Sequence, residues 1–379
     1  MTPTTLAAKP HYPILDGLRG VAALLVVAFH LLEAHATSHQ TQLINHGYLA
    51  VDFFFLLSGF VIGYAYDDRW GGMSLGDFVK RRLVRLQPLV VLGTVVGAAL
   101  FYFGACPQMA LIAQTPGWKV ALYVLLGALM LPVTPALDIR GWQESYPLNG
   151  PGWSLLYEYV ANVLYAVLVR RFSRVALAVL VAVSAVVLVQ FLVTRPEGDI
   201  AGGWSLDALQ IRIGLTRVLF PFFAGLLLFR TVRPGRIGGA FWLSSLLLVA
   251  VLAWPRVGGP AHPARNGLYE AGSIILLFPL IVYLGASGTL ASAASRRLCR
   301  FLGDISYPIY ITHYPLIYVY TAWVYTHKVP VRAGLPWAAL TFAAAVALAY
   351  ASLRLYDEPV RRWLGRKVLA HPGAAPGRA

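Results

Sequence analysis

The sequence contains few cysteines and few charged residues for a chain of 379 residues. It has only two cysteines, Cys106 and Cys299, and its His, Cys, Asp and Glu residues do not recur at the spacing of metal ligands. We therefore expect no bound metal. In the topology derived below, the two cysteines fall on opposite faces of a membrane, so a disulfide between them is also excluded.

Charged residues make up only 12% of the chain, hydrophobic residues make up 58%, and the mean hydropathy is +0.65. A soluble core of this size does not need so much apolar residue, so the composition predicts a polytopic membrane protein. Acidic residues are scarce, with 16 Asp and Glu against 31 Lys and Arg. In a soluble protein this excess would suggest nucleic acid. Here the basic residues lie in short loops between apolar runs, so we expect contact with membrane lipids and no nucleic acid partner.

Apolar runs long enough to cross a bilayer, which needs about twenty residues, recur ten times. The runs lie near residues 14–33, 48–66, 88–105, 152–169, 175–194, 211–229, 240–254, 268–285, 304–325 and 335–356. An eleventh run at 120–133 is shorter. The sequence thus predicts an all-α fold, a polytopic transmembrane helical bundle of about ten spanning helices.

Basic clusters set the expected topology, because short loops rich in Lys and Arg face the cytoplasm. Clusters occur at 80–85, 170–174, 230–236, 296–300 and 361–367. An even number of spans must separate neighbouring clusters, but three apolar runs lie between the first two. We therefore expect the short 120–133 run to be a re-entrant or interfacial segment on the outer side. Both termini are then cytoplasmic, and we expect the protein in the bacterial inner membrane.

The remaining segments complete the expected domain organisation. Residues 1–13 form a cytoplasmic N-terminal segment and residues 14–356 the transmembrane domain. Residues 357–379 are basic and rich in Gly, Pro and Ala, which predicts a disordered cytoplasmic tail. The 106–151 connection is the longest outer segment and has the most room for a substrate surface.

Two polar side chains, Arg19 and His30, stand in the first apolar run. Polar residues in hydrocarbon are functional candidates. Eleven residues of α-helix turn through about 1100°, which brings both side chains within roughly 20° of one face, about 16 Å apart along the axis. A charge that can hold phosphate is thus aligned with a titratable imidazole. Asp16, one turn earlier, is placed to hold the Arg19 guanidinium. Taken alone, His30 is equally compatible with helix packing.

Asp52 lies about one turn from the outer end of the second run, near the depth of His30. A carboxylate beside an imidazole fixes its tautomer and raises its basicity, as a general base requires. The alternative is a cap or ion pair near the interface. Arg82 and Arg85 are three residues apart on one helical face, and two guanidiniums on one face suit a phosphate. The alternative there is a plain cytoplasmic basic cluster.

Polar residues also enter two later runs. In GWSLLYE, Ser154 and Glu158 are four residues apart, with Glu158 about two turns deep. This carboxylate is expected to face the bundle interior, where it positions an acceptor hydroxyl or stabilises a charged histidine; pairing with an arginine is the alternative. In SYPIYITHYP, Tyr310 and His313 are one turn apart. A structural role for His313 remains open.

Five segments together resemble the acyltransferase-3 family of bacterial integral-membrane O-acyltransferases. They are LDGLRGVAALLVVAFH, VDFFFLLSGF, RRLVR, GWSLLYE and SYPIYITHYP. Any single segment is a weak signal, but the set is specific, because it follows the family's order from residue 15 to residue 315. The chain resembles the stand-alone members, which have no fused esterase-like domain.

The resemblance implies an enzyme with an acyltransferase domain over residues 14–356 and no metal. It implies acyl-coenzyme A as the cytoplasmic donor of an acyl group, usually acetyl. The acceptor is then a hydroxyl of an extracytoplasmic or membrane-associated molecule, commonly a cell-envelope or exported saccharide. Some relatives acylate small molecules such as macrolides, which leaves that alternative open.

The family's functional residues carry over by motif. His30 matches its essential histidine and Arg19 the arginine partner. The other matches are the arginine pair and the Trp-Ser-Leu-x-x-Glu element, here Arg82, Arg85, Ser154 and Glu158. The expected catalytic residues are His30, Asp52 and Glu158. The expected donor-binding residues are Arg19, Arg82 and Arg85. The residues expected to position the acceptor are Trp153, Ser154 and His313.

Two catalytic routes remain open at this point: His30 acts as general base on the acceptor hydroxyl, or it is transiently acylated. Two other classes of function are also compatible with ten helices and buried polar groups. One is a transporter or exporter of lipid-linked saccharide, although transporters often show internal repeats and none is visible here. The other is a non-catalytic subunit of an envelope assembly, which gives no reason for the Arg19–His30 alignment.

Overall fold

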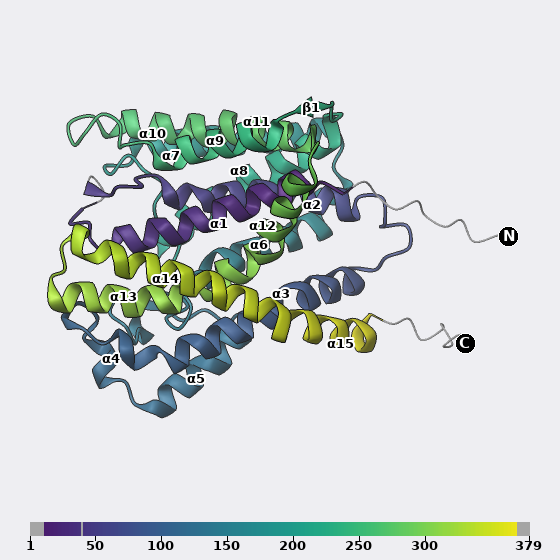
Figure 1. The fold of residues 1–379 in the computed structure, drawn as a ribbon. Coiled ribbons are helices and arrows are strands. Elements are labelled where there is room, and N and C mark those ends of the chain that lie inside the picture. Colours follow the sequence, from purple (N-terminus) through teal and green to yellow (C-terminus); the bar gives the residue numbers. More distant parts are fainter. Residues whose placement is uncertain (1–10, 39–40, 370–379) are drawn as a thin grey trace.

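The computed structural model describes residues 11–38 and 41–369, and nearly all of this part is helical (Figure 1). The only strands assigned in these ranges are β1 (Ile237–Gly238) and β2 (Gly288–Thr289), which form a two-residue parallel pair. The all-α class predicted from the sequence is therefore confirmed.

Fifteen α-helices are assigned in the described ranges. The first eight are α1 (Pro13–Glu33), α2 (Ala50–Tyr66), α3 (Leu75–Ala99), α4 (Leu111–Gln114), α5 (Gly117–Ala128), α6 (Gly152–Val167), α7 (Arg174–Thr194) and α8 (Ala208–Thr231). The others are α9 (Ala240–Ala253), α10 (Pro263–Gly272), α11 (Phe278–Ala286), α12 (Ala293–Thr312), α13 (Tyr314–His327), α14 (Val331–Ala351) and α15 (Glu358–Val368). Two π-helical segments, Ser273–Leu277 and Ser352–Asp357, join α10 to α11 and α14 to α15.

Seven helical stretches within the described residues are long and apolar enough to cross a membrane. They are Pro13–Glu33, Gly47–Tyr66, Leu75–Ala99, Arg174–Thr194, Ala208–Thr231, Pro263–Ala286 and Val331–Val368. Seven such stretches agree with the integral membrane protein predicted from the composition.

Three of the ten predicted spans fall short of these criteria. Helix α6 has 16 residues and α9 has 14, which at 1.5 Å per residue gives about 24 and 21 Å against a hydrocarbon core of about 30 Å. The third run, 304–325, is divided between α12 and α13 at His313. Helix α5, in the short eleventh run, has 12 residues. The count of about ten spans therefore stays a prediction.

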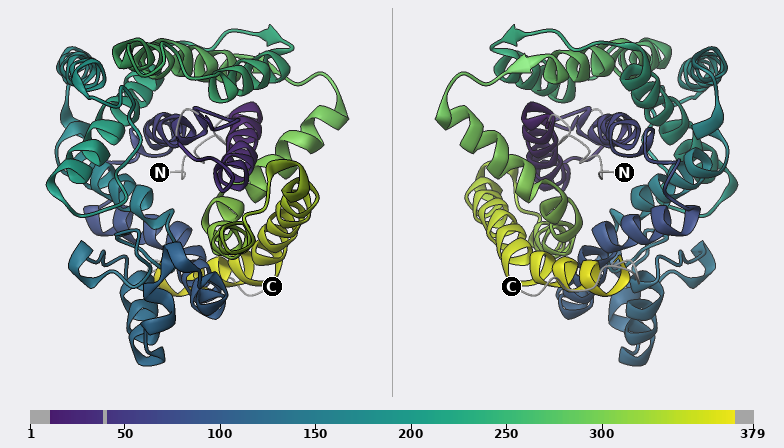
Figure 2. Two further views of the ribbon diagram at one scale, coloured as in Figure 1. Left: turned by 90° about the vertical axis from the view of Figure 1, so that its left-hand side faces the viewer. Right: turned by 90° about the vertical axis from the view of Figure 1, so that its right-hand side faces the viewer.

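Helices α1 and α2 lie near the centre of the bundle when it is viewed from either end (Figure 2). Close backbone contacts at glycines hold them there. A Cβ on Gly20 would meet the Leu302 carbonyl oxygen of α12 at 2.3 Å, and one on Gly59 would meet the Phe222 carbonyl oxygen of α8 at 1.8 Å. Small residues at these positions let the backbones approach, as is usual between membrane helices.

The chain after residue 357 differs from the sequence-based expectation. Residues 358–368 form α15 and not a disordered tail, and α15 packs against α3 (Figure 1). Ion pairs four residues apart link Asp357 to Arg361 and Glu358 to Arg362, each at 3.0 Å, and such pairs support a helix. The composition rule failed because it ignores this spacing. Residues 370–379 lie outside the described ranges.

Candidate active site

Two cavities lie inside the bundle and share part of their walls. The first has a volume of about 650 Å³, and we call it the arginine cavity after the six arginines that line it: Arg19, Arg81, Arg82, Arg85, Arg361 and Arg362. The second has a volume of about 400 Å³, and we call it the histidine cavity because His30 lines it. Val51 and Tyr310 line both. The two cavities therefore adjoin at these residues.

Arg19 is held in place on the wall of the arginine cavity. Its Nε donates to the Ser306 hydroxyl of α12 at 2.7 Å, and its Nη2 lies 3.1 Å from the Asp16 carboxylate. The contact expected between Asp16 and Arg19 is therefore present. The Ser306 contact comes from the SYPIYITHYP segment and could not be read from local spacing. Arg19, near the beginning of α1, lines the arginine cavity, and His30, near the end of α1, lines the histidine cavity.

Glu158 lines the arginine cavity and not the histidine cavity, so the expectation that it stabilises a charged His30 is wrong. Its Oε1 accepts hydrogen bonds from Arg82 Nη2 at 2.5 Å and from the Ser58 hydroxyl at 2.7 Å. Helix α6 begins at Gly152, so its second turn reaches the level of Arg82 on α3. Pairing with an arginine, the alternative considered for Glu158, is what the structure shows.

Arg82 and Arg85 both line the arginine cavity, and Arg85 keeps its guanidinium donors free of bonds to the described residues. The Nε of Arg82 is buried and has no partner among the described residues. Arg85 is exposed to the cavity, and its guanidinium makes no hydrogen bond or close ion pair with any residue in the described ranges. Free guanidinium donors facing one space are suited to a phosphate or pyrophosphate.

His30 is paired with a carboxylate, but not the expected one. Its Nδ1 lies 2.8 Å from the Glu33 carboxylate, one turn further along α1. Asp52 instead accepts from Arg217 of α8, at 2.7 Å from Nη2, and both side chains are almost fully buried. The expectation that Asp52 orients His30 is therefore wrong, because the Asp52 side chain is directed toward α8. The His30 Nε2 has no hydrogen-bond partner among the described residues.

His313 packs against His30 and is not among the residues that line either cavity. The two imidazole rings are stacked, with centroids 5.7 Å apart and planes inclined by 27°. Nδ1 of His313 donates to the Ile309 carbonyl at 2.9 Å, so Nε2 carries the lone pair, and this buried atom has no partner in the described part of the chain. His313 thus contacts His30, and its role in positioning the acceptor stays a prediction.

Ser154 and Trp153 face different cavities although they are neighbours in α6. The Ser154 hydroxyl lies 2.6 Å from the Tyr310 hydroxyl and lines the arginine cavity. Trp153 lines the histidine cavity, where its ring lies 5.0 Å from the Arg217 guanidinium. The beginning of α6 therefore contributes to the wall between the two cavities.

The chain matches a known protein family over most of its length. A family model described as an acyltransferase domain matches residues 12–354, which include every predicted site residue. The chain belongs to the acyltransferase-3 family. It is therefore an acyltransferase.

Three relatives show how far the similarity extends. "Protein 2 in picA locus" of Rhizobium radiobacter is 37% identical over 183 residues, which are 46% of this chain and 91% of that protein. "Acyltransferase MdmB" of Streptomyces mycarofaciens is 27% identical over 80% of this chain and 79% of that protein. "Putative peptidoglycan O-acetyltransferase YrhL" of Bacillus subtilis is 24% identical over 82% of this chain but only 49% of that protein. No solved structure matches the chain significantly.

A second carboxylate on the wall of the histidine cavity of this acyltransferase, Glu144, was not expected from the sequence. Its Oε2 accepts from the Tyr318 hydroxyl at 2.5 Å, and the buried Arg140 lies 3.9 Å away with its guanidinium 3.4 Å from the Tyr318 ring centroid. Burial raises the pKa of Glu144 to about 7. The only sequence signal was the length of the 106–151 segment, because these contacts join residues far apart in the chain.

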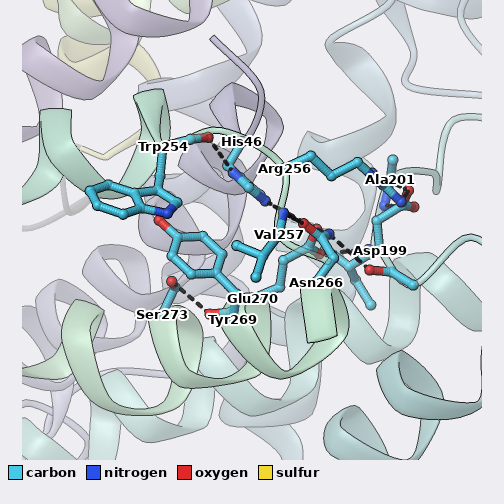
Figure 3. Close-up of polar contacts among 12 residues, drawn as sticks. His46, Asp199, Ala201, Trp254, Arg256, Val257, Asn266, Tyr269, Glu270 and Ser273 are labelled. Atoms are coloured by element: carbon cyan, nitrogen blue, oxygen red, sulfur yellow. Dashed lines mark hydrogen bonds and ion pairs between the residues drawn. The ribbon is translucent and has the colours of Figure 1, made fainter. Parts of the chain in front are cut away.

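A buried polar network surrounds His46, Asn266 and Glu270 of the acyltransferase (Figure 3). His46 contacts Asn266 through Nε2 at 3.0 Å, and the Asn266 amide donates to Glu270 at 2.8 Å. Glu270 accepts further bonds from the Tyr48 hydroxyl at 2.5 Å and from the Ile200 backbone amide at 2.8 Å. Because Tyr48 lines the histidine cavity, this network fixes part of its wall.

Proposed function

We propose that this acyltransferase moves an acyl group, usually acetyl, from cytoplasmic acyl-coenzyme A to a hydroxyl of an extracytoplasmic or membrane-associated saccharide. The observation that carries the proposal is the pair of cavities that adjoin at Val51 and Tyr310. One cavity offers cations for a phosphate-bearing donor. The other offers an imidazole for a hydroxyl-bearing acceptor. The acyl group is then transferred at the wall that the arginine cavity and the histidine cavity share.

The arginine cavity fits the donor in charge and in size. Arg85 is free of hydrogen bonds to the described residues, so its guanidinium has donors for phosphate oxygens, and Arg82 lines the same cavity one helical turn away. A volume of about 650 Å³ lies within the range of about 300–1,000 Å³ typical of ligand sites. Acyl-coenzyme A supplies the activated thioester. Arg19, Arg82 and Arg85 bind and orient its phosphates.

His30 acts as the general base in this proposal. If Nδ1 of His30 carries its proton toward Glu33, the neutral ring presents the lone pair of Nε2 to the histidine cavity. That atom takes the proton of the acceptor hydroxyl as the hydroxyl oxygen attacks the thioester carbonyl. The carbon–sulfur bond of the thioester then breaks, and coenzyme A leaves as a thiolate that takes the proton from the imidazolium. Glu33 stabilises the imidazolium while it carries this proton. The sequence had led us to expect Asp52 as the carboxylate partner of His30.

The wall of the histidine cavity favours a saccharide among hydroxyl-bearing acceptors. Its aromatic residues are Phe29, Tyr48, Trp142, Trp153, Trp204, Tyr310, Tyr314 and Tyr325. Such rings pack against the apolar faces of sugar rings and offer polar edges to their hydroxyls. Two carboxylates on the same wall, Glu33 and Glu144, accept hydrogen bonds from hydroxyls.

The distribution of arginines supports the proposed orientation. The arginine cavity opens among the basic stretches at the start of α3 and in α15, and short basic segments remain on the cytoplasmic side. We therefore place this end of the bundle, and both termini, in the cytoplasm of a bacterial cell. The histidine cavity then opens toward the outer face of the inner membrane.

Reconstituted protein tests the proposal. Proteoliposomes are supplied with radiolabelled acetyl-coenzyme A and with an extract of envelope saccharides, and base-labile label is measured in the saccharide fraction. We expect label that depends on the protein and is lost with His30→Ala. Label confined to small molecules would contradict the saccharide acceptor. The absence of label from every fraction, together with failure to bind coenzyme A, would contradict the donor.

A further inference from the structure

Helix α15 contributes to the arginine cavity although it lies beyond the family match, which ends at residue 354. Arg361, Arg362 and Gly365 of α15 line the cavity, together with Leu369 just after the helix. Figure 1 shows α15 beside α3, the helix that carries the Arg82–Arg85 pair. The cavity therefore has a wall that the family motifs do not account for.

The π-helical segment Ser352–Asp357 joins α14 to α15 and contributes Leu353 and Asp357 to the cavity wall. Segments of this kind are rare and often occur at functional sites. Asp357, its last residue, lines the cavity and is 1% exposed. Its Oδ2 accepts from Arg361 at 3.0 Å, while its buried Oδ1 has no partner among the described residues. Asp357 thus holds Arg361 at the cavity wall.

The arginines of the cavity differ in depth. The side chain of Arg82 is 7% exposed and that of Arg19 is 26% exposed, whereas Arg361 is 42% and Arg362 is 69% exposed. Arg361 and Arg362, like the exposed Arg85, therefore stand nearer the mouth of the cavity than Arg19 and Arg82. The deep end is the wall shared with the histidine cavity at Tyr310.

Arg362 can exchange its partner, while Arg361 keeps the bond from its Nη1 to the buried Asp357. Arg362 pairs with Glu358 four residues away, and exposed pairs of this type contribute little to stability. The cavity wall carries six arginines against four carboxylates, those of Glu158, Asp304, Asp357 and Glu358, so positive charge is in excess. A phosphate dianion at the mouth gains charge-assisted bonds without burying an unpaired charge.

We propose that Arg361 and Arg362 bind the ribose 3′-phosphate of the coenzyme A donor at the mouth of the arginine cavity. The inference rests on the proposed function, which puts the thioester at the shared wall. In coenzyme A the nucleotide is at the opposite end of the molecule from the thioester. The nucleotide therefore lies at the mouth, and its 3′-phosphate is the phosphomonoester available there to a guanidinium pair.

The test compares two ligands that differ only in that phosphate. Calorimetry measures the binding of coenzyme A and of 3′-dephospho-coenzyme A to the purified full chain in zwitterionic nanodiscs. The variants are Arg361→Gln with Arg362→Gln and, as a matched control, Arg366→Gln with Lys367→Gln. The control removes the same charge from the same helix at residues that are not among those lining the cavity. Thermal unfolding checks that each variant is folded.

We expect the wild type to bind coenzyme A at least about tenfold more tightly than the dephospho form, as the loss of charge-assisted bonds predicts. The Arg361/Arg362 variant should lose this preference, and the control should keep it. A wild type that binds coenzyme A without preferring the 3′-phosphate would overturn the inference and leave the proposed function intact. A wild type that binds neither ligand would overturn both. If the variant binds coenzyme A and keeps the wild-type preference for the 3′-phosphate, the inference is also wrong.

Discussion

The hydroxyls of Ser154 and Tyr310 lie 2.6 Å apart at the wall that separates the two cavities. Tyr310 lines both cavities, and Ser154 lines the arginine cavity. In the proposed mechanism this pair stands where the thioester and the acceptor hydroxyl meet. The pair joins α6 to α12, so it also fixes the separation of the two helices at this level.

Removing the Tyr310 hydroxyl tests this placement. Tyr310→Phe keeps the ring that both cavities share and removes only the bond to Ser154. We expect the rate of acyl transfer to fall by about five- to tenfold, the effect of one hydrogen bond, while the affinity for coenzyme A stays unchanged. Transfer rates and calorimetric binding check this. A variant that loses donor affinity to the same extent would place Tyr310 in the donor site alone.

Arg82 and Arg85 should respond differently to substitution. Arg85→Gln removes a guanidinium without a close partner, so we expect weaker binding of coenzyme A by about 1.5–3 kcal/mol and little change in the melting temperature. Arg82→Gln also breaks the contact with Glu158 and leaves that carboxylate without its counterion, so we expect lower stability as well. Calorimetry and thermal unfolding of both variants check the contrast. Equal loss of stability in the two would show that Arg85 is a structural residue.

The two carboxylates considered as partners of His30 make a matched pair of variants. We expect Glu33→Gln to slow transfer with little loss of stability, because Glu33 contacts the base near the cavity. Asp52→Asn should instead lower the free energy of unfolding by about 3–5 kcal/mol, because it breaks a buried ion pair with Arg217. Chemical unfolding in detergent and transfer rates separate the two. The reverse result would restore Asp52 as the partner of His30.

Glu144 should make stability depend on pH. Its pKa in the folded protein, raised by burial to about 7, lies above its ordinary value of 4.5. The folded state therefore binds a proton more strongly than the unfolded state, so this contribution is fully present below pH 4.5 and is lost as the pH rises to about 7. We expect Glu144→Gln to flatten the fall in melting temperature over that interval. Parallel slopes for wild type and variant would contradict the raised pKa.

The sequence was informative where local geometry decides the outcome. Helical periodicity placed Arg19 and His30 on one helix, and spacing placed Asp16 beside Arg19. The sequence was not informative where a contact joins segments that are far apart in the chain. Asp52 pairs with Arg217, and Glu144 accepts a hydrogen bond from Tyr318, 174 residues away. Glu33 was within local reach, one turn from His30, but nothing in a single sequence ranks it above Asp52. Composition alone also did not indicate α15, because the ion pairs that support this helix depend on the exact spacing of its acidic and basic residues.

The most direct measurement concerns His30. Cells lacking the gene are complemented with the wild type, with His30→Ala or with His327→Ala, an exposed histidine that serves as the control. Mass spectrometry then measures ester-linked acyl groups on envelope saccharides and secreted metabolites at matched protein levels. The account predicts an acylated saccharide with the wild type and the control, and none with His30→Ala. Acylation at the wild-type level by His30→Ala would contradict it.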